Sequence, residues 1–459
     1  MYVYTFRKSP FHNFKTVKIS IVVPVFKKGD RGDIGNYRPI SIIPVFGKIL
    51  ESILKPRIVR FVEGSGLLCN SQFGFRPGRG TIDALLHLVG DIVGGFEGGA
   101  YVGITLCDLS RAFDCVSHDV MLKKLNTHFG FRGHALTFFG SYLRGRRQCV
   151  DRGDHRSEVR PVEFGVPQGS VLGPIFFILY INDLCHFLLP DRCLLYADDT
   201  TLIGTDRDLV SLTDKMDALE KRAGSWFCAG SLVLNSDKTQ RIVFSSDSKF
   251  TSGAEARLLG VTLDDGLTWS AHVTHLCNKI SKNIFVLRRL KRVLSTQTLL
   301  NVYYALIFSH ISYGIVLWGR CAHFLRVFRM QKRAVRVLAG VRYRDHCRPL
   351  FKHFGLLTAP CIYIYYTLVC IRNNISDYST GSAYHNHDTR RASDLRPVRF
   401  RLRRSAVNSL PIALYNKLPE NLRTLHASQF KRVIKSLLTE QAFYSVEEYL
   451  AYTFPVEGS

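Results

Sequence analysis

Runs of apolar residues along the first 265 positions predict strands separated by helical or turn-forming segments. The β-branched run Ile19–Val25 ends at a Lys-Lys-Gly-Asp turn at 27–30, as expected for a strand followed by a tight turn. The nearly continuous apolar run Tyr101–Leu109 predicts a strand that is buried on both faces of a sheet. Leu194–Ile203 is apolar at both ends and holds Asp198 and Asp199 between them, which predicts a β-hairpin with the two aspartates at its tip.

Helical segments are predicted between these strands. We expect helices over Ile40–Val59, after Pro39, over Asp206–Gly230, and from Pro174 through 181, where proline suits the first turn. Short strands are expected at 232–234, paired with 241–244, and at 258–263. The final third consists of helical pieces around a basic, turn-rich stretch at 385–404 that we interpret as a loop. The pattern predicts an α+β fold in which a mixed sheet carries helices on one side.

Composition narrows the class of protein. The 459 residues are 46% hydrophobic and 22% charged, which suits about three compact units and excludes a mostly disordered chain. No apolar run reaches the roughly 18–20 residues of a membrane span, and no signal peptide opens the chain, so we expect an intracellular protein with no membrane partner. The 12 cysteines form no Cys-x-x-Cys pair, and we expect reduced thiols rather than a structural zinc site.

Positive charge is concentrated in the second half of the chain. There are 62 Lys and Arg against 37 Asp and Glu, a net charge of +25 that points to a polyanionic partner. The stretch 266–344 alone holds 14 basic side chains and no acidic one. Its apolar residues repeat at helical spacing, at Ile280, Ile284, Leu287 and Leu290. We predict a helical hairpin whose basic face binds a phosphate backbone, and the alternative is a basic surface that is only solvated.

Three aspartates stand where a buried strand or hairpin would ordinarily carry no charge. Asp108 follows the strand predicted from Tyr101, and Asp198 and Asp199 occupy the predicted hairpin tip. Converging carboxylates repel each other unless cations neutralise them, and oxygen ligands with room for water and phosphate suit Mg²⁺. Two such ions can activate a 3′-hydroxyl and stabilise a leaving pyrophosphate. For the pair at 198–199 alone, an ordinary turn dipeptide is the alternative.

Ordered sequence blocks between 27 and 263 resemble those of the reverse transcriptases of non-LTR retrotransposons, of the jockey-like kind. Tyr-Ala-Asp-Asp at 196–199 resembles the active-site hairpin of that family, and Asp-Leu-Ser-Arg-Ala-Phe-Asp at 108–114 resembles its first carboxylate block. The other similar blocks are Asn-Tyr-Arg-Pro-Ile-Ser at 36–41, Gln-Phe-Gly-Phe-Arg at 72–76, Gly-Val-Pro-Gln-Gly-Ser-Val-Leu-Gly-Pro at 165–174, Leu-Asn-x-x-Lys-Thr at 234–239 and Leu-Gly-Val at 259–261. The resemblance implies an RNA-directed DNA polymerase that extends a DNA 3′-end on an RNA template.

The resemblance also implies a metal site and a nucleotide site. Two Mg²⁺ ions, or Mn²⁺ in their place, would be held by Asp108, the backbone carbonyl of Leu109, Asp198 and, more weakly, Asp199. The incoming dNTP would be held by one of two adjacent lysines, by an arginine and by a glycine-flanked loop. These residues are Lys27 or Lys28, with Lys27 favoured, Arg38, and the loop residues Gln168 and Gly169.

The same resemblance implies roles for four further residues. Phe113 would exclude the ribose 2′-hydroxyl, and Lys238 would protonate the leaving pyrophosphate. Gly260 would belong to the grip on the primer end, and Asp114 would cap the helix that follows Phe113. A core phenylalanine and a surface lysine are the alternatives for Phe113 and Lys238.

The architecture that the resemblance implies is the right-hand polymerase. Fingers are expected at 1–100, a palm with inserted fingers elements at 101–265, a basic helical thumb at 266–345, and a mainly helical C-terminal extension at 346–459. The partners would be an RNA template, a DNA primer and dNTPs, in the nucleus. Complete elements carry an endonuclease domain ahead of the polymerase, and we expect that function to be absent from this chain.

Two other functions are weighed against this one. The first is a catalytically silent nucleic-acid-binding remnant of a truncated retroelement, which would keep the basic surface and the fold. The second is an RNA-directed RNA polymerase, against which Ala197 and Phe113 argue, since such enzymes resemble this architecture with glycine before the aspartate pair and a polar residue at the gate.

Overall fold

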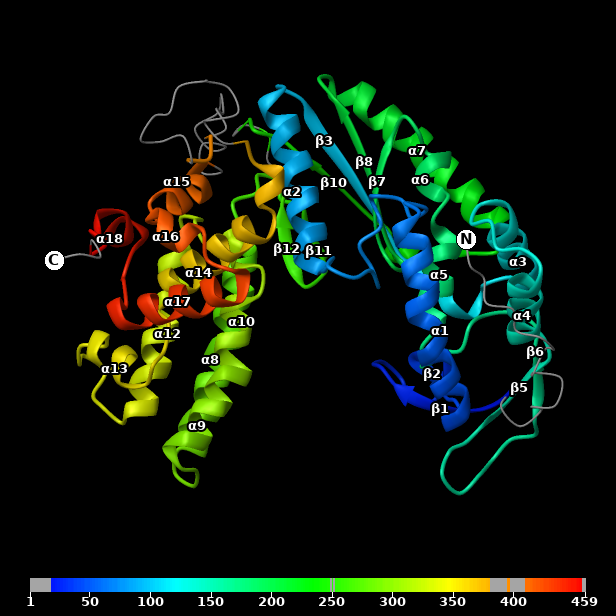
Figure 1. Ribbon diagram of the computed structural model, residues 1–459, viewed down its shortest axis with the longest axis horizontal. Helices are drawn as coiled ribbons and strands as arrows, with labels where there is room; N and C mark the ends of the chain where they lie inside the picture. Colours follow the sequence, from blue (N-terminus) through cyan, green and yellow to red (C-terminus); the bar gives the residue numbers. More distant parts are fainter. Residues whose placement is uncertain (1–17, 248–249, 251, 380–393, 397–408, 456–459) are drawn as a thin grey trace. The chain divides into compact units, whose positions relative to one another are not determined.

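The chain forms two compact units, each of which is described by itself (Figure 1). A computed structural model describes residues 18–247, 250, 252–379, 394–396 and 409–455. The first unit comprises the described residues of Met1–Leu88 and Tyr101–Val243, and the second those of Val89–Ala100 and Phe244–Ser459. The loop expected at 385–404 lies outside the described residues, apart from 394–396. The boundaries of fingers, palm, thumb and extension stay predictions.

Two four-stranded sheets build the first unit. One has the strand order β10-β3-β8-β7, and in it β3 and β7 both pair antiparallel with β8. The other has the order β2-β1-β5-β6 and is mixed, because β1 runs antiparallel to β2 and parallel to β5. The strands are β1 Ile19–Phe26, β2 Tyr37–Ile42, β3 Tyr101–Cys107, β4 Leu109–Ser110, β5 Arg146–Val150, β6 Arg160–Val162, β7 Arg192–Tyr196, β8 Asp199–Asp206, β9 Val233–Leu234 and β10 Gln240–Phe244.

Helices connect these strands, and α7 packs along β3 and β8. Close contact is possible there because Gly103 and Gly204 face each other across the two strands and leave room for the Met216 side chain of α7. The helices are α1 Val45–Gly64, α2 Thr81–Glu97, α3 His118–Thr127, α4 His134–Leu143, α5 Gly173–Ile181, α6 Leu184–Phe187 and α7 Leu209–Ala229, with the short 3₁₀ helices η2 Ile34–Asn36, η3 Ala112–Asp114 and η4 Ser236–Lys238.

Most of the predicted elements are confirmed, but the helix predicted over 40–59 is partly wrong. Residues Tyr37–Ile42 form β2, and α1 begins only at Val45. A proline cannot donate a backbone hydrogen bond, so strands tolerate it mainly at the edge of a sheet. Pro39 meets this condition because β2 is the edge strand, and Pro44 then precedes the first residue of the helix.

Two predicted strand arrangements are also wrong in detail. Strands β9 and β10 form, but β9 pairs with β4 and β10 lies beside β3, because η4 turns the chain between them. The single strand predicted at 258–263 is a hairpin of β11 Glu255–Leu258 and β12 Val261–Asp264. Its tip consists of Leu259 and Gly260, which both adopt positive φ angles, a conformation that glycine adopts readily.

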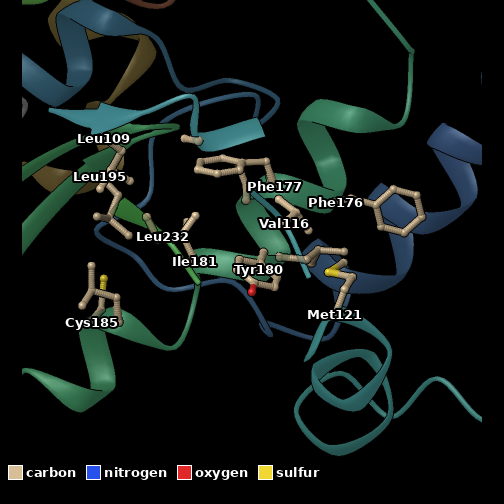
Figure 2. Packing of buried hydrophobic residues seen from close by; sticks show 14 of the residues in the cluster. Leu109, Val116, Met121, Phe176, Phe177, Tyr180, Ile181, Cys185, Leu195 and Leu232 are labelled. Atoms are coloured by element: carbon tan, nitrogen blue, oxygen red, sulfur yellow. The ribbon is translucent and has the colours of Figure 1, made fainter. Parts of the chain in front are cut away.

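The core of the first unit surrounds α5, whose side chains are buried on every side of the helix. Figure 2 shows Phe176, Phe177 and Tyr180 leaving this helix in different directions. The Phe176 ring packs against the rings of Phe139 and Tyr142, with centroids 5.5 Å away in both cases. The loop at 165–172, which leads into α5, is therefore attached to the most rigidly packed helix of the unit.

The second unit is helical apart from the β11–β12 hairpin, within the part of the chain that the structure describes. Helix α8 Ser270–Leu290 packs against α12 Phe324–Ala339. The predicted helical repeat is confirmed, since Ile280, Ile284 and Leu287 are buried. The other helices are α9 Thr296–Tyr303, the π-helix η5 Tyr304–Phe308, α10 Ser309–Ser312, α11 Ile315–Trp318, α13 Arg348–His353, α14 Ala359–Asn373, η6 Ile375–Asp377, α15 Leu410–Asn416, α16 Glu420–Arg423, α17 Ala427–Gln441 and α18 Val446–Ala451. None of the described helices combines the length and apolar character needed to cross a bilayer.

A buried glutamate on α1 ties that helix to the loop before α5. Glu51 is 1% exposed, and its Oε1 accepts a hydrogen bond from the Tyr142 hydroxyl at 2.7 Å. Its Oε2 accepts from the backbone N–H of Val171 at 2.6 Å and of Leu172 at 3.4 Å. These amides precede a helix and find no partner within it, so the carboxylate satisfies groups that would otherwise be buried without a hydrogen bond.

Replacing this carboxylate should destabilise the first unit. Glu51→Ala should lower the free energy of unfolding by about 2–4 kcal/mol, because the Tyr142 hydroxyl and the Val171 amide lose their shared acceptor. Glu51→Gln keeps one acceptor oxygen and should lose roughly half as much. Urea denaturation measures both. As a control, Glu158→Ala removes a carboxylate that is 85% exposed and should change stability by less than about 0.5 kcal/mol; equal losses for Glu51→Ala and the control would contradict the assignment.

Candidate active site

Asp108 lies at the end of the central strand β3, where the chain leaves the sheet. β4 follows immediately, and its pairing with β9 places Leu109 opposite Leu234. The backbone N–H of Asn235 donates to the Asp108 carbonyl at 2.8 Å. The turn η4 then brings the Lys238 ammonium to 3.2 Å from Asp108 Oδ2. The predicted carboxylate and the predicted proton donor therefore form an ion pair, although they are 130 residues apart in sequence.

Asp198 and Asp199 lie at the tip of the β7–β8 hairpin, as predicted. Tyr196 pairs with Asp199, and Ala197 occupies the turn with a φ of 57°, a left-handed conformation that costs free energy for any residue with a Cβ. The antiparallel register of β3 and β8 pairs Cys107 with Thr200. Asp108 and Asp199 each lie one residue beyond that pair, so all three aspartates gather at one end of the sheet.

The Gln-Phe-Gly-Phe-Arg block at 72–76 packs against this turn and hydrogen-bonds to it. The sequence did not predict this supporting role. Gln72 is fully buried, and its Oε1 accepts from the backbone N–H of Ala197 at 3.2 Å and of Gly74 at 2.8 Å. A Cβ at Gly74 would lie 2.4 Å from the Ala197 nitrogen, so only glycine permits the approach. Sequence spacing gives no signal for this contact because the two segments are more than 120 residues apart.

Arg76 anchors the same block. Its guanidinium makes a two-pronged contact with Glu63 of α1, at 2.8 Å to Oε1 and 2.6 Å to Oε2, and also donates to the carbonyls of Cys69 and Gln72. The hydrogen bond from Arg76 is the largest of the influences that hold the pKa of Glu63 below its usual range. The block that supports the aspartate turn is thereby fastened to a helix.

The pKa values of Asp198 and Asp199 are both raised where the three aspartates come together. Both carboxylates of the hairpin remain open to solvent at its tip, yet the surrounding protein partly desolvates them. Burial, and then the charges of Asp198 and Asp108, raise the pKa of Asp199 to about 6. The pKa of Asp198 is raised by burial and by Asp108, and the positive charges of Arg38 and Lys27 act in the opposite direction.

Lys27 and Arg38 thus lie close enough to act on Asp198, as expected for residues of one site. Lys27 follows β1, where its backbone N–H donates to the Asn36 carbonyl at 2.9 Å, and Arg38 stands opposite Val25 in β2. The choice between Lys27 and Lys28, with Lys27 favoured, stays a prediction, and the charge of Lys27 is among those that oppose the rise in the pKa of Asp198. Both cationic side chains are exposed and free to meet a ligand.

In the described residues, no three Asp, Glu, His or Cys side chains are grouped closely enough to form a ready-made metal cage. The aspartates approach each other without closing around a common point, and Lys238 occupies one oxygen of Asp108. The residues nevertheless fit a divalent cation, since two partly desolvated carboxylates with raised pKa values are stabilised by added positive charge.

The loop at 165–169 lies against both the first carboxylate block and strand β2. The Ser41 backbone N–H donates to the Gln168 carbonyl at 2.7 Å. Gly169 has a φ of 117°, and a Cβ there would lie 2.7 Å from the Ser41 carbonyl oxygen, so this position requires glycine. The side chain of Gln168 contacts Asp114. The expectation that Asp114 caps the next helix is wrong, because the Ser117 side chain caps α3.

Phe113, the predicted sugar gate, is partly buried in η3. Its ring stacks on Phe177 of α5, with centroids 4.7 Å apart and planes 24° apart. The ring of Phe75 meets it edge-on at 6.5 Å. The gate assignment stays a prediction, and the ring packs against Phe177 of the buried helix α5.

The second unit carries the predicted basic surface and the predicted primer grip. Arg288 and Arg289, near the end of α8, and Arg292 just beyond it are all exposed. On α12, Arg326, Arg329 and Arg333 are exposed at helical spacing, opposite the buried Val327, Gln331 and Ala334. Gly260, at the hairpin tip, packs against Tyr313, whose hydroxyl donates to the Leu259 carbonyl.

Comparison with known proteins agrees with this geometry. Residues 25–263 match the family Reverse transcriptase (RNA-dependent DNA polymerase). A probable RNA-directed DNA polymerase from transposon X-element of Drosophila melanogaster is 29% identical over 74% of this chain and 40% of its own length. The RNA-directed DNA polymerase from mobile element jockey of the same organism is 26% identical over 73% of this chain and 40% of its own length. A probable RNA-directed DNA polymerase from transposon BS, also of Drosophila melanogaster, is 28% identical over 75% of this chain and 41% of its own length. The chain thus spans about 40% of the length of the curated relatives it matches.

Solved structures of telomerases are also similar to parts of the chain. One is a telomerase from Candida albicans in complex with a TWJ fragment of telomeric RNA. The match covers 72% of this chain and 63% of the telomerase chain, with 12% sequence identity and a TM-score of 0.45. An apo telomerase from Candida tropicalis matches 81% and 68%, with 12% identity and a TM-score of 0.42.

The family match covers more than half of the chain and includes every residue of the first unit that the site brings together. The α+β fold class expected for a right-hand polymerase is confirmed by the two sheets and the helices around them. The relatives are polymerases of jockey-like non-LTR elements, as the sequence blocks predict. This chain therefore belongs to the reverse transcriptase family, with the jockey-like non-LTR retrotransposon enzymes as its relatives.

Proposed function

We propose that this chain is an RNA-directed DNA polymerase that extends a DNA 3′-end on an RNA template by two-metal nucleotidyl transfer. The observation that carries the proposal is the convergence of Asp108, Asp198 and Asp199 at one end of the sheet, with the pKa values of the latter two raised. The jockey and X-element relatives are RNA-directed DNA polymerases by name, and that chemistry needs such a carboxylate cluster.

The metal site would use the side chains of Asp108, Asp198 and Asp199 with the carbonyl of Leu109. Oxygen ligands of this kind suit Mg²⁺, and Mn²⁺ could replace it. When bound, two such ions lower the pKa of the primer 3′-hydroxyl and neutralise the charge that develops on the pyrophosphate. The raised pKa values of the hairpin aspartates support this assignment because burial, and then the charge of neighbouring aspartates, disfavours their ionised forms, which a bound cation would stabilise.

The other residues would bind and protonate the triphosphate. Lys27 and Arg38 would contact its phosphates, and the planar guanidinium of Arg38 can donate two parallel hydrogen bonds to phosphate oxygens. Gln168 and Gly169 would lie along the nucleotide, where the glycine lets the backbone come close. Lys238, which forms an ion pair with Asp108, would supply the proton to the leaving pyrophosphate.

Removing one metal ligand should abolish synthesis and spare binding. Asp198→Asn should reduce extension of oligo(dT) on poly(rA), with Mg²⁺ and dTTP, by about a thousandfold or more. The dissociation constant for primer–template should change less than about threefold, because the variant keeps every cationic group that could bind a phosphate. The control Asp119→Asn alters an aspartate side chain that is 82% exposed and should leave both unchanged.

Two outcomes would count against the proposal. Residual extension by Asp198→Asn within about tenfold of the unaltered chain would remove this aspartate from the reaction. An unaltered chain that binds primer–template but extends nothing would instead be the catalytically silent remnant.

Phe113 would select dNTPs over rNTPs. We expect the Phe113 ring, which stacks on Phe177, to occupy the space that a ribose 2′-hydroxyl would need. Phe113→Val should therefore lower the ratio of kcat/KM for dTTP to that for UTP by about tenfold or more, chiefly through a gain with UTP. Single-nucleotide incorporation measures this ratio. The matched control Phe187→Val, at a ring 46% exposed on α6, should leave it unchanged; an unchanged ratio in Phe113→Val would place the gate elsewhere.

The basic surface of the second unit would hold the primer–template by its phosphates. A heteroduplex near A-form is recognised by shape and backbone, so binding should be nearly independent of sequence. Arg288, Arg289 and Arg292 are exposed on or just after α8, in a stretch that contains no carboxylate to pair with them. Products made in one binding event should lengthen with the number of phosphates that this surface neutralises.

Charge reversal at these three arginines should change the salt dependence of binding. With all three replaced by Glu, the slope of log affinity against log salt should flatten by about 0.7–0.9 for each phosphate that is no longer neutralised, and products should shorten. Replacement of the same three by Lys keeps the charge and should keep the slope. Filter binding across a salt series and single-cycle extension report the two effects; an unchanged slope with normal product length would defeat the thumb assignment.

A further inference from the structure

The turn after Asp108 and the loop at 165–169 are joined by their backbones. The N–H of Val166 donates to the Phe113 carbonyl at 2.8 Å, and the N–H of Gly165 donates to the Val116 carbonyl at 2.7 Å. A Cβ at Gly165 would lie 2.8 Å from the Cα of Asp114, so the two segments touch without an intervening side chain. The position of the loop is therefore set by main-chain contacts, independently of the side chain of Asp114.

Asp114 and Gln168 meet at this junction through their side chains. Gln168 Nε2 lies 3.1 Å from Asp114 Oδ1 and 3.1 Å from Oδ2. An ionised carboxylate can only accept hydrogen bonds, whereas an amide has a donating end and an accepting end. The pairing therefore decides which end of the amide faces Asp114, which is a choice that an isolated glutamine leaves open.

The surroundings of Asp114 indicate that this contact is its main polar interaction. Burial raises the pKa of Asp114, and the hydrogen bond from Gln168, followed by the charge of Arg111, opposes that rise. The carboxylate does not cap α3, since Ser117 has that role. Within the described part of the chain, the side-chain hydrogen bonds that this partly buried carboxylate accepts come from the amide of Gln168.

We propose that Asp114 is a positioning residue for nucleotide binding: it holds the NH₂ group of Gln168 and so presents the amide oxygen, Oε1, to a hydrogen-bond donor on the incoming nucleotide. A sugar hydroxyl is the donor that a nucleoside triphosphate offers beside its phosphates. The inference rests on the proposed function, in which Gln168 contacts the nucleotide, and adds the residue that orients it. Asp114 itself touches no reacting atom.

A double-mutant cycle tests this coupling without requiring catalysis. The dissociation constant for dTTP is measured on poly(rA) with a dideoxy-terminated oligo(dT), for the unaltered chain, Asp114→Ala, Gln168→Ala and the double variant. Each single change should weaken dTTP binding about tenfold. Gln168→Ala removes the amide that contacts the nucleotide, and Asp114→Ala removes the carboxylate that orients this amide. The double variant should be within about twofold of the weaker single one, because Asp114 acts only through Gln168. Multiplying effects, near a hundredfold, would overturn the proposal.

Exchange of donor and acceptor provides a second test. Gln168→Glu sets two carboxylates against each other and should weaken dTTP binding more than Gln168→Ala does. Adding Asp114→Asn supplies an NH₂ group on the other side of the pair and should restore at least about fivefold of that loss. Absence of any recovery would contradict an orienting role. This test still decides the matter if Asp114→Ala does not fold.

Controls separate this inference from the proposed function and from a structural effect. Asp119→Ala, on the neighbouring helix α3, removes an exposed carboxylate and should leave dTTP binding unchanged. The affinity for primer–template should be alike in all the Asp114 and Gln168 variants, and the melting temperature should be alike in Asp114→Ala, Gln168→Ala and the double variant, because the loop keeps its backbone bonds. If Asp198→Asn retained synthesis, the proposed function would fail; an additive cycle beside an inactive Asp198→Asn would defeat the positioning role alone.

Discussion

The crowding of negative charge at one end of a sheet is the constraint on which the rest of the site depends. Asp108, Asp198 and Asp199 are brought together by strand pairing, and their burial and mutual repulsion appear as raised pKa values at the hairpin. Cations compensate from two directions, Lys238 at Asp108 and the pair Lys27 and Arg38 toward Asp198. An arrangement that is unfavourable in isolation is suited to ligands that carry metal ions and phosphates.

Hydrogen bonds to backbone groups position the turn and the loop of the site. The turn at Ala197 is backed by Gln72 and Gly74, and the loop at 165–169 is bonded to the first carboxylate block and to β2. Glycine recurs at 74, 165 and 169 because a Cβ at each of these positions would clash with the neighbouring backbone. The loop leads directly into α5, which is buried on all sides, so the packing of the core fixes the position of the loop.

In the proposed function, the first unit would carry out the nucleotidyl transfer, and the basic surface of the second unit would attract the nucleic acid. The first unit carries the three carboxylates and has 31 basic against 22 acidic residues, whereas the second has 31 basic against 15 acidic residues, with basic side chains on helices whose apolar faces are buried within the unit. A long basic surface attracts any polyanion and chooses little among sequences. Selectivity would then come from the first unit, where Phe113 and the paired Asp114 and Gln168 are held in defined orientations.

The sequence by itself determined the α+β class, the central strand, the aspartate hairpin and the basic helical stretch, because each follows from local periodicity or from ordered blocks. The family resemblance also assigns Arg38 and either Lys27 or Lys28, with Lys27 favoured, to a nucleotide site, and these roles stay predictions. Contacts between segments distant in sequence were decided only by the tertiary structure: the support of Ala197 by Gln72, the ion pair of Lys238 with Asp108, and the bond from Gln168 to Asp114. No local pattern encodes which backbone groups will meet, since that depends on how the strands and α5 pack together.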